Sequence, residues 1–459
     1  MKKLITLVAL TIFLKAGAQV CFTDTIIPML TESRSILCND YNNDTKLDLI
    51  ITSIFGKELY LLIGDGNGNF NTANLVYYDQ NGGNFSGIVS GDFNGDGNVD
   101  LAYPDYATAG YVRILSGDGT GNFTATDSFA VGDHPRIICG ADFNRDGNID
   151  ISVANETDRN ISVLLGNGSG YFTTNTGNHI GKNPTAMTSS DFNGDNFADL
   201  AITCNNDGGP DSVWVLIGDG TGNFGSAAKY LCGSGPYSVC SKDFNADGFD
   251  DIAVANKNSN NVSVLLSKGT SGLFYNAINY NAGTGAATSA PFSVVSADIN
   301  FDGIPDLAIA NYYQSIVFLL IGTGNGTFGS STYFPAHYGP WTIITADFNG
   351  DEKPDLATTQ QSSYNITVLL NCYFSDIESY DNEHDFTVYP NPSDGNFVVE
   401  ISIPGKPLLQ IFDITGNLMY SEYIEGKTHI RAQSLKCGIY NMNITNSEYL
   451  LNKKLIIVK

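Results

Sequence analysis

The sequence is poor in charged residues and in the residues that favour helices. Asp, Glu, Lys and Arg make up only 15% of the 459 residues, whereas Gly, Asn, Tyr and Phe are abundant. Helices draw on straight-chain and charged residues, while strands and tight turns use aromatic residues and glycine. The composition therefore predicts an all-β protein.

Basic residues are also few. The chain has 23 Lys and Arg against 48 Asp and Glu, which gives a formal net charge of −25 at pH 7. This balance argues against a general affinity for nucleic acid or anionic lipid, because both are bound through basic residues. It also suggests that a cation neutralises part of the charge.

Long apolar runs are missing after the N-terminus. Lys2 and Lys3 precede an apolar stretch at residues 4–14, and the small residues Ala-Gly-Ala follow at 16–18. This pattern predicts a signal peptide over residues 1–18. The stretch is shorter than the ~20 residues that span a bilayer, and no later segment is apolar enough. We therefore expect no transmembrane segment and an exported, soluble chain in which disulfides persist.

One short motif recurs seven times at intervals of roughly 50 residues. It has the form Asp-x-Asn-x-Asp-x-x-x-Asp, and a β-rich run precedes each copy. An apolar strand, a second strand, a glycine hairpin and a last strand follow it. Four short strands per unit are typical of a propeller blade. Residues 19–372 are therefore predicted to form a seven-bladed β-propeller.

The two ends of this region predict how the ring closes. The seventh unit stops at Cys372 without a hairpin or fourth strand, whereas the segment that starts at Cys21 matches a fourth strand. We expect the N-terminal strand to complete the seventh blade. That alignment places Cys21 and Cys372 close together, which predicts a disulfide worth about 4–5 kcal/mol. Two unpaired thiols are the alternative.

The motif offers oxygen atoms at positions 1, 3, 5 and 9, and oxygen is the ligand that Ca²⁺ prefers. Glycine at position 6 in several loops allows the left-handed turn that would fold the chain around an ion. We expect up to seven structural Ca²⁺ ions. The predicted ligands are Asp40, Asn42, Asp44, Asp48, Asp92, Asn94, Asp96, Asp100, Asp142, Asn144, Asp146, Asp150, Asp191, Asn193, Asp195, Asp199, Asp243, Asn245, Asp247, Asp251, Asp298, Asn300, Asp302, Asp306, Asp347, Asn349, Asp351 and Asp355.

An EF-hand is the rival interpretation, because it shares the opening Asp-x-Asn-x-Asp-Gly. It fails because no copy has Glu at position 12 and because strands, not helices, flank the loop. The first and seventh loops carry Thr45 and Glu352 at position 6, so we expect them to bind Ca²⁺ more weakly. Asn196 stands there in the fourth loop and tolerates the left-handed conformation. Empty Asx-turns are the alternative for any loop.

These units resemble the FG-GAP/VCBS repeats of bacterial surface proteins and the propeller of integrin α-subunits, over residues 20 to 372. An acidic linker at 373–385 follows. Residues 386–459 then carry Val388-Tyr-Pro-Asn-Pro392, Gly438-Ile-Tyr440 and a terminal Lys453-Lys454 strand. This module resembles the C-terminal sorting domain of the type IX secretion system, a small β-sandwich. The resemblance implies contact with that machinery, then release or surface attachment. A sandwich with a binding role of its own is the alternative.

The face opposite the motif loops is the predicted ligand face. Residues six positions before each motif should ring the mouth of the channel: Arg34, Ser86, Arg136, Thr185, Tyr237, Phe292 and Trp341. Aromatic residues, among them Tyr312, Tyr313 and Tyr364, concentrate in the last three blades and suit a sugar ring or a protein hot spot. The candidate ligand residues are Arg34, Arg136, Tyr237, Phe292, Tyr312 and Trp341. Rings that simply plug the channel are the alternative.

Two classes of function follow from the sequence. The first is a secreted or surface-attached, non-catalytic binding or adhesion module for a glycan or a protein. The second is a polysaccharide lyase or hydrolase built on the propeller, which could use His134 with Arg136, or His337, as acid–base groups. The five His form no cluster, no nucleophile motif is present and no separate catalytic domain fits. The sequence therefore favours binding and gives no catalytic residue.

Overall fold

The computed structural model describes two units of the chain, Met1–Phe374 and Ser375–Lys459. The described residues are 20, 22–53, 57–79, 87–106, 108–205, 211–284, 289–372, 386–391, 393–402, 406–412, 418–433, 435–436, 438–445 and 450–458. The predicted signal peptide and linker lie outside them. Within these ranges every regular element is a strand, which confirms the all-β prediction. The described residues contain no helix long and apolar enough to cross a membrane.

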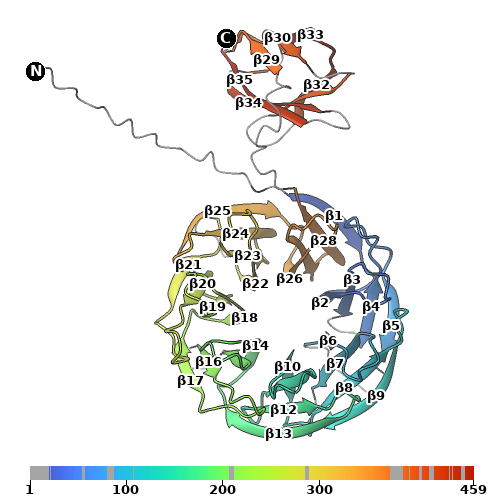
Figure 1. Ribbon diagram of the computed structural model, residues 1–459, viewed down its shortest axis with the longest axis vertical. Coiled ribbons are helices and arrows are strands. Elements are labelled where there is room, and N and C mark those ends of the chain that lie inside the picture. Colours follow the sequence, from blue (N-terminus) through green and yellow to red (C-terminus); the bar gives the residue numbers. More distant parts are fainter. Residues whose placement is uncertain are drawn as a thin grey trace, which may run out of the picture. The chain divides into compact units, whose positions relative to one another are not determined.

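The described strands of the first unit form seven four-stranded sheets arranged around a ring (Figure 1). Each innermost strand contacts the next around the ring, and the last contacts the first. In ring order they are β2 (Ser33–Asn39), β6 (Val89–Gly91), β10 (Pro135–Ala141), β14 (Pro184–Ser190), β18 (Pro236–Lys242), β22 (Pro291–Ala297) and β26 (Pro340–Ala346). The predicted β-propeller is confirmed.

The remaining strands run outward from the channel in chain order. The second strands, buried along their whole length, are β3 (Asp48–Ser53), β7 (Asp100–Asp105), β11 (Asp150–Asn155), β15 (Asp199–Cys204), β19 (Asp251–Asn256), β23 (Asp306–Asn311) and β27 (Asp355–Gln360). The third strands are β4 (Glu58–Leu62), β8 (Tyr111–Gly117), β12 (Asn160–Gly166), β16 (Ser212–Leu216), β20 (Asn261–Leu265), β24 (Ile316–Gly322) and β28 (Asn365–Asn371). The fourth strands are β5 (Asn74–Tyr78), β9 (Phe123–Ala130), β13 (Phe172–His179), β17 (Ala228–Leu231), β21 (Ile278–Asn281) and β25 (Phe328–Pro335).

The sheet that contains β26, β27 and β28 takes its outer strand from the other end of the chain. β1 (Phe22–Pro28) pairs antiparallel with β28, from Phe22 opposite Asn371 to Pro28 opposite Asn365. This pairing joins the first and last parts of the ring by backbone hydrogen bonds.

Apolar contacts between neighbouring sheets hold the ring together. Among the described residues, seven buried clusters each combine side chains of two adjacent sheets. One of them packs Ile36 and Leu49 of the first sheet against Ile366 and Val368 of the last. Burial of this kind stabilises at about 25 cal/mol per Å² of apolar surface. Every interface in the ring thus has a core of its own.

Aromatic pairs tie six of the seven motif loops to the following sheet. In these loops the second residue of the motif is buried, and its ring packs edge-on against a phenylalanine that ends the next hairpin; the sixth loop has Ile299 at this position. Phe143 and Phe224 lie 5.5 Å apart between ring centroids, and Phe192 and Phe274 lie 5.4 Å apart. The motif therefore packs across the sheet interface as well as shaping its own loop.

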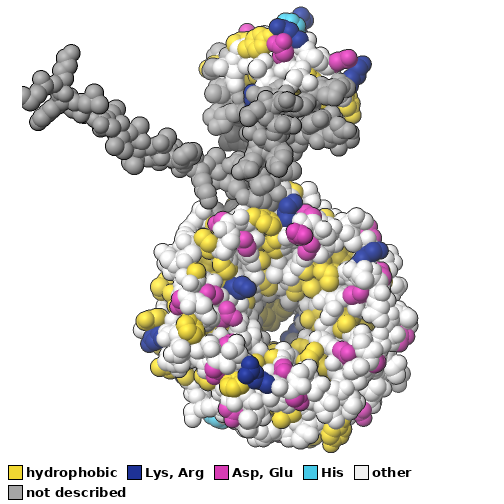
Figure 2. Space-filling view, viewed as in Figure 1, with side chains coloured by type: hydrophobic (Ala, Val, Ile, Leu, Met, Phe, Trp, Pro, Cys, Tyr) yellow, Lys and Arg dark blue, Asp and Glu magenta, His cyan; other side chains and the backbone are white. Residues whose placement is uncertain are grey.

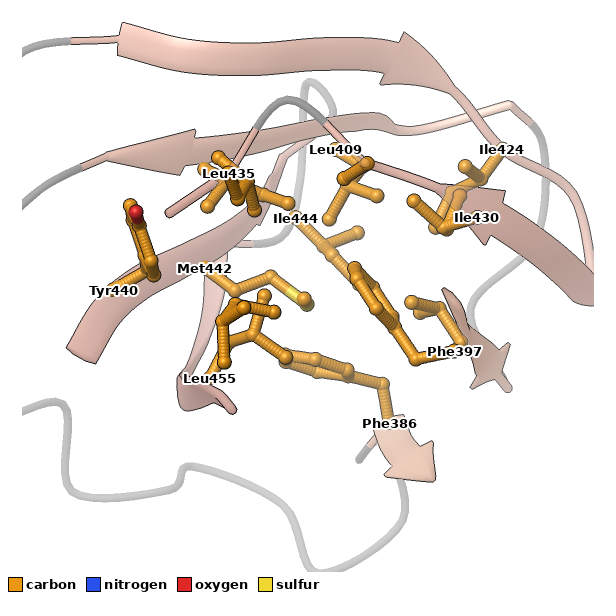
Figure 3. Close-up of a cluster of buried hydrophobic side chains, with 14 of the residues drawn as sticks. Phe386, Phe397, Leu409, Ile424, Ile430, Leu435, Tyr440, Met442, Ile444 and Leu455 are labelled. Atoms are coloured by element: carbon orange, nitrogen blue, oxygen red, sulfur yellow. The ribbon is translucent and has the colours of Figure 1, made fainter. Parts of the chain in front are cut away.

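The second unit consists of a three-stranded and a four-stranded sheet. The first contains β29 (Phe386–Tyr389), β30 (Asn396–Ile401) and β33 (Lys427–Arg431); the second contains β32 (Leu418–Tyr423), β31 (Leu408–Phe412), β34 (Gly438–Thr445) and β35 (Leu450–Ile457). Between them Phe386, Phe397, Leu409, Met442 and Leu455 form one buried cluster (Figure 3). This arrangement is the predicted small β-sandwich.

Candidate functional site

The seven motif loops join each innermost strand to the second strand of its sheet. In all seven the residue at position 6 has a positive φ, from 62° at Asn196 to 87° at Gly248, and so does the residue at position 4. Thr45 (φ 69°) and Glu352 (φ 63°) adopt this left-handed conformation without glycine. Because a side chain costs roughly 1–2 kcal/mol in that region, the first and seventh loops carry strain at position 6 that the glycine-containing loops avoid there.

Side-chain oxygens at positions 1, 3 and 5 are turned into the loop and accept its N–H groups. In the third loop, Asp142 Oδ2 accepts the N–H of Gly147 at 3.0 Å, and Asn144 Oδ1 accepts that of Asp146 at 2.9 Å. Asp146 Oδ1 in turn accepts the N–H of Asn148 at 2.9 Å. A carboxylate has about four lone-pair sites, so these bonds leave oxygen lone pairs for a cation.

The aspartate at position 9 has a role that the sequence did not indicate. It is the first residue of the second strand and at most 1% exposed in every sheet. Asp150 Oδ2 accepts the N–H of Phe143 at 2.8 Å, and its Oδ1 accepts that of Gly166 at 2.7 Å. The same two bonds recur in all seven sheets. This side chain therefore pins the motif loop to the end of the third strand.

Burial dominates the electrostatics of these aspartates. Desolvation raises the pKa of Asp150 to about 6 and that of Asp251 to about 7, and the accepted hydrogen bonds oppose the shift. The acidic residues at positions 1 and 5 raise the pKa of the position 9 aspartate further.

In the described residues, no three His, Cys, Asp or Glu side chains are gathered as a metal site would need. The loops fit a hard cation by their oxygen donors, with Asn and backbone oxygens needed to complete the set.

The opposite end of the innermost strands carries the predicted mouth residues. Arg34, Arg136, Thr185, Tyr237, Phe292 and Trp341 are each the second residue of their strand. In all six strands the pairing with the second strand shifts by one residue at this point. Such a β-bulge re-aims a side chain and is common beside binding sites.

A proline starts five of these six strands, and it marks the bulge in the sequence. Pro135, Pro184, Pro236, Pro291 and Pro340 each precede a mouth residue. Proline has no N–H to give to a sheet and is tolerated at strand starts and bulges. Its recurrence one position before a variable residue was a signal that sequence reasoning missed.

Five of the six candidate ligand residues surround one cavity of about 310 Å³. Its walls include Arg34, Arg136, Tyr237, Phe292 and Trp341, and residues from all seven innermost segments contribute. Figure 2 shows the ring hollowed at its centre, with Lys and Arg side chains nearby. The predicted neighbour Ser86 lies outside the described residues.

The sixth candidate, Tyr312, belongs to an aromatic cluster behind the cavity wall. Its ring centroid lies 5.2 Å from that of Phe292 and 5.8 Å from that of Trp341. Phe292 and Trp341 pack 4.1 Å apart, and Tyr237 lies 4.7 Å from Phe292. Phe292 is 3% exposed, so it supports the other rings. The rings pack against one another on one side and leave the cavity open.

Lys257 and Glu156 were not foreseen at the mouth. Lys257 Nζ lies 4.5 Å from the centroid of Phe292, which is a cation–π distance. Glu156 Oε2 lies 3.2 Å from Arg136 Nη1. Both line a second hollow of about 340 Å³ that shares Arg136 and Tyr237 with the first.

The histidines considered for acid–base chemistry lie on different blades, and neither lines the cavity. His134 Nδ1 is 2.9 Å from Thr157 Oγ1, and its ring packs on Tyr106. His337 Nε2 is 3.2 Å from Asp24 Oδ2. The structure therefore does not bring them together.

Comparisons with known proteins identify both the repeats and the C-terminal unit. The family model of the FG-GAP-like repeat matches residues 40–103, 92–153, 142–202, 243–309 and 298–358, together more than half of the chain. The model of a secretion system C-terminal sorting domain matches residues 387–458. No curated protein matches the sequence.

Two solved structures have a similar arrangement. A protein from Lactobacillus plantarum aligns with a TM-score of 0.52 at 15% identity, over 86% of this chain and 96% of that one. A functionally unknown protein from Desulfotomaculum acetoxidans DSM 771 aligns with a TM-score of 0.49 at 10% identity, over 84% and 99%. At 15% identity, the likeness to the Lactobacillus plantarum protein concerns the fold alone.

Proposed function

The chain belongs to the FG-GAP-like repeat family, and on that premise we propose that its propeller is a calcium-stabilised, non-catalytic binding module for a glycan. The sorting domain indicates export by type IX secretion to the cell surface or beyond it, and it implies contact with that secretion machinery. A signal peptide over residues 1–18 would direct the first membrane crossing.

The cavity at the channel mouth is the observation that carries this proposal. Small-molecule sites are concave, lined by aromatic and apolar groups, and fixed by a few polar side chains. The cavity combines Trp341 and Tyr237, both half-buried, with Arg34, Arg136 and Thr185. Aromatic rings give a sugar a flat apolar surface, and the polar groups can bond its hydroxyls. The volume of about 310 Å³ suits a sugar unit better than a folded protein.

Calcium has a structural part in this proposal. The loops supply oxygen donors at positions 1, 3 and 5 beside the buried aspartate of position 9. Ca²⁺ takes six to eight oxygen ligands in flexible geometry, which carboxylates, Asn amides and backbone carbonyls can supply together. The ion would offset the repulsion between three aspartates in each loop.

A disulfide between Cys21 and Cys372 would add a covalent closure. Cys372 directly follows β28, while Cys21 lies outside the described residues. Phe22 pairs with Asn371 in the sheet, so the next step of the same register would place residue 21 opposite residue 372. The pairing remains a prediction that peptide mapping without reduction tests.

A glycan array tests the binding role. The calcium-loaded protein is expected to bind a small set of glycans, and Trp341→Ala is expected to lose that binding. Tyr333→Ala removes an aromatic side chain that is 54% exposed on an outer strand, so it is the matched control and should bind as the wild type does. Absence of any glycan binding would refute the proposal and direct the search to a protein partner.

Turnover of a polysaccharide panel separates binding from catalysis. The proposal expects no cleavage products. Cleavage that disappears in His134→Ala or His337→Ala would instead establish the enzyme built on the propeller.

A further inference from the structure

The cavity at the channel mouth is cationic in a strongly anionic protein. Its described walls contain the guanidinium groups of Arg34 and Arg136 and no Asp or Glu, although the whole chain carries a formal charge of −25. A cavity lined by one sign of charge attracts ligands of the opposite sign. The wall therefore selects against cations and in favour of anions.

Among the described residues, Arg34 has no protein partner for its charge. In the part of the chain that the structure describes, its guanidinium makes no hydrogen bond or ion pair, whereas Arg136 pairs with Glu156 and Arg113 with Asp105. Burial lowers the pKa of Arg34, the nearby Arg136 adds to that decrease, and Tyr237 opposes it. Withdrawing an unpaired charge from water costs free energy that a bound anion would offset.

The backbone holds Arg34 in place at the boundary between the first and last sheets. Its carbonyl oxygen accepts the hydroxyl of Thr342 at 2.6 Å and that of Thr359 at 3.1 Å. Arg34 also lies where the pairing of β2 and β3 shifts by one residue, between Ser33 and Ile36. A backbone that is already held in place does not have to be ordered when a ligand binds, which lowers the entropic cost of binding.

We propose that this cavity binds an acidic sugar, a saccharide that carries a carboxylate, with Arg34 as the partner of the carboxylate. The inference rests on the glycan-binding role proposed above and names the class of ligand. The planar guanidinium fork matches a carboxylate by two parallel hydrogen bonds. Trp341 is the second residue of β26 in the neighbouring last sheet and lines the same cavity, so one ligand can contact the ring and the guanidinium together.

Calorimetric titration of the full calcium-loaded protein tests this proposal. The probes are an oligogalacturonate, a neutral oligosaccharide of equal length and a sulfated one. The wild type is expected to bind the oligogalacturonate most tightly, less so at high salt. Arg34→Ala should weaken that binding roughly tenfold to hundredfold, as expected for hydrogen bonds to a charged group. Arg34→Lys should recover part of it, because lysine keeps the charge and loses the fork.

Arg159→Ala is the matched control, because it removes an exposed arginine from the β11–β12 turn away from the cavity wall. It should bind as the wild type does. If Arg34→Ala unfolds at a lower temperature than the wild type, Arg34→Gln takes its place, because glutamine keeps most of the side-chain length. Arg34→Gln should lose the same affinity. Equal binding of acidic and neutral probes would overturn the inference and leave the glycan role intact. Preference for the sulfated probe would overturn the carboxylate assignment, and no glycan binding would overturn both proposals.

Discussion

The two ends of the innermost strands differ in what is repeated. At the end of each strand the motif loop keeps its side chains, so Asp recurs at position 9 with the same two hydrogen bonds in all seven sheets. At the start of six strands the bulge keeps its backbone, while the side chain changes from Arg34 to Thr185 to Trp341. Repeated side chains serve a task that every blade shares, and a repeated backbone with varied side chains can serve one particular ligand.

Removing calcium is expected to have the largest effect on this comparison. A site filled at a hundred times its Kd contributes about 2.7 kcal/mol, so several loops together rival the whole stability of a domain, about 5–15 kcal/mol. Calorimetry with a chelator should show the propeller transition moving to a much lower temperature, with the sandwich transition unchanged as an internal control. Recovery with Ca²⁺ but not with equal Mg²⁺ is expected. A propeller transition indifferent to the chelator would refute calcium binding.

Removing the predicted disulfide that closes the ring is expected to have the second largest effect on stability. Cys372→Ser should lower the free energy of unfolding by up to about 4–5 kcal/mol, because it releases a long closed loop in the unfolded state. The free, half-buried Cys232 provides the matched control as Cys232→Ser. Peptide mapping without reduction should recover Cys21 joined to Cys372. A different partner for Cys372 would contradict the predicted closure, though not the pairing of β1 with β28.

Two aspartates of the fifth motif loop can separate the structural role of position 9 from metal binding at position 5. Asp251 is buried and accepts the N–H groups of Phe244 and Ser267, while Asp247 is exposed. Asp251→Ala should cost about 2–5 kcal/mol even with a chelator present, because two buried N–H groups lose their acceptor. Asp247→Ala should then cost less than about 1 kcal/mol. Urea unfolding of both variants in EDTA measures the difference, and a loss for Asp251→Ala as small as that for Asp247→Ala would show that the two hydrogen bonds of position 9 do not stabilise the metal-free fold.

Much of the fold could be predicted because the motif fixes both the period and the order of the strands. The missing hairpin after Cys372 also indicated that another segment must complete the last sheet, and β1 lies beside β28. Local sequence was sufficient here, since each blade repeats the same turns and strands.

The sites were harder to predict, because they depend on contacts between distant residues. Position 9 was predicted as a metal ligand, and its bonds to the third-strand end depend on a residue 16 to 19 positions away. The bulges depend on strand register, which the pattern of apolar residues does not reveal at a strand end. Among the described residues, Arg34 has no ion-pair partner, since Glu156 pairs with Arg136 instead. Which arginine pairs with which acid depends on the fold and cannot be read from the sequence.

The smallest expected effect on stability comes from the backbone strain at position 6, which differs among the seven motif loops. Thr45 holds φ 69° at position 6, where glycine stands in four of the other loops. Thr45→Gly should raise the stability by about 1 kcal/mol, since removing the β-branched side chain relieves more strain than the added chain entropy costs. The reverse change, Gly147→Thr, should cost about 1–2 kcal/mol. A Cβ at Gly147 would meet nothing within 4 Å, so that cost reports backbone conformation alone. A calcium titration should show fewer than seven tight sites in the wild type and one more in Thr45→Gly. Seven equal sites in the wild type would show that strain at position 6 does not set the affinity.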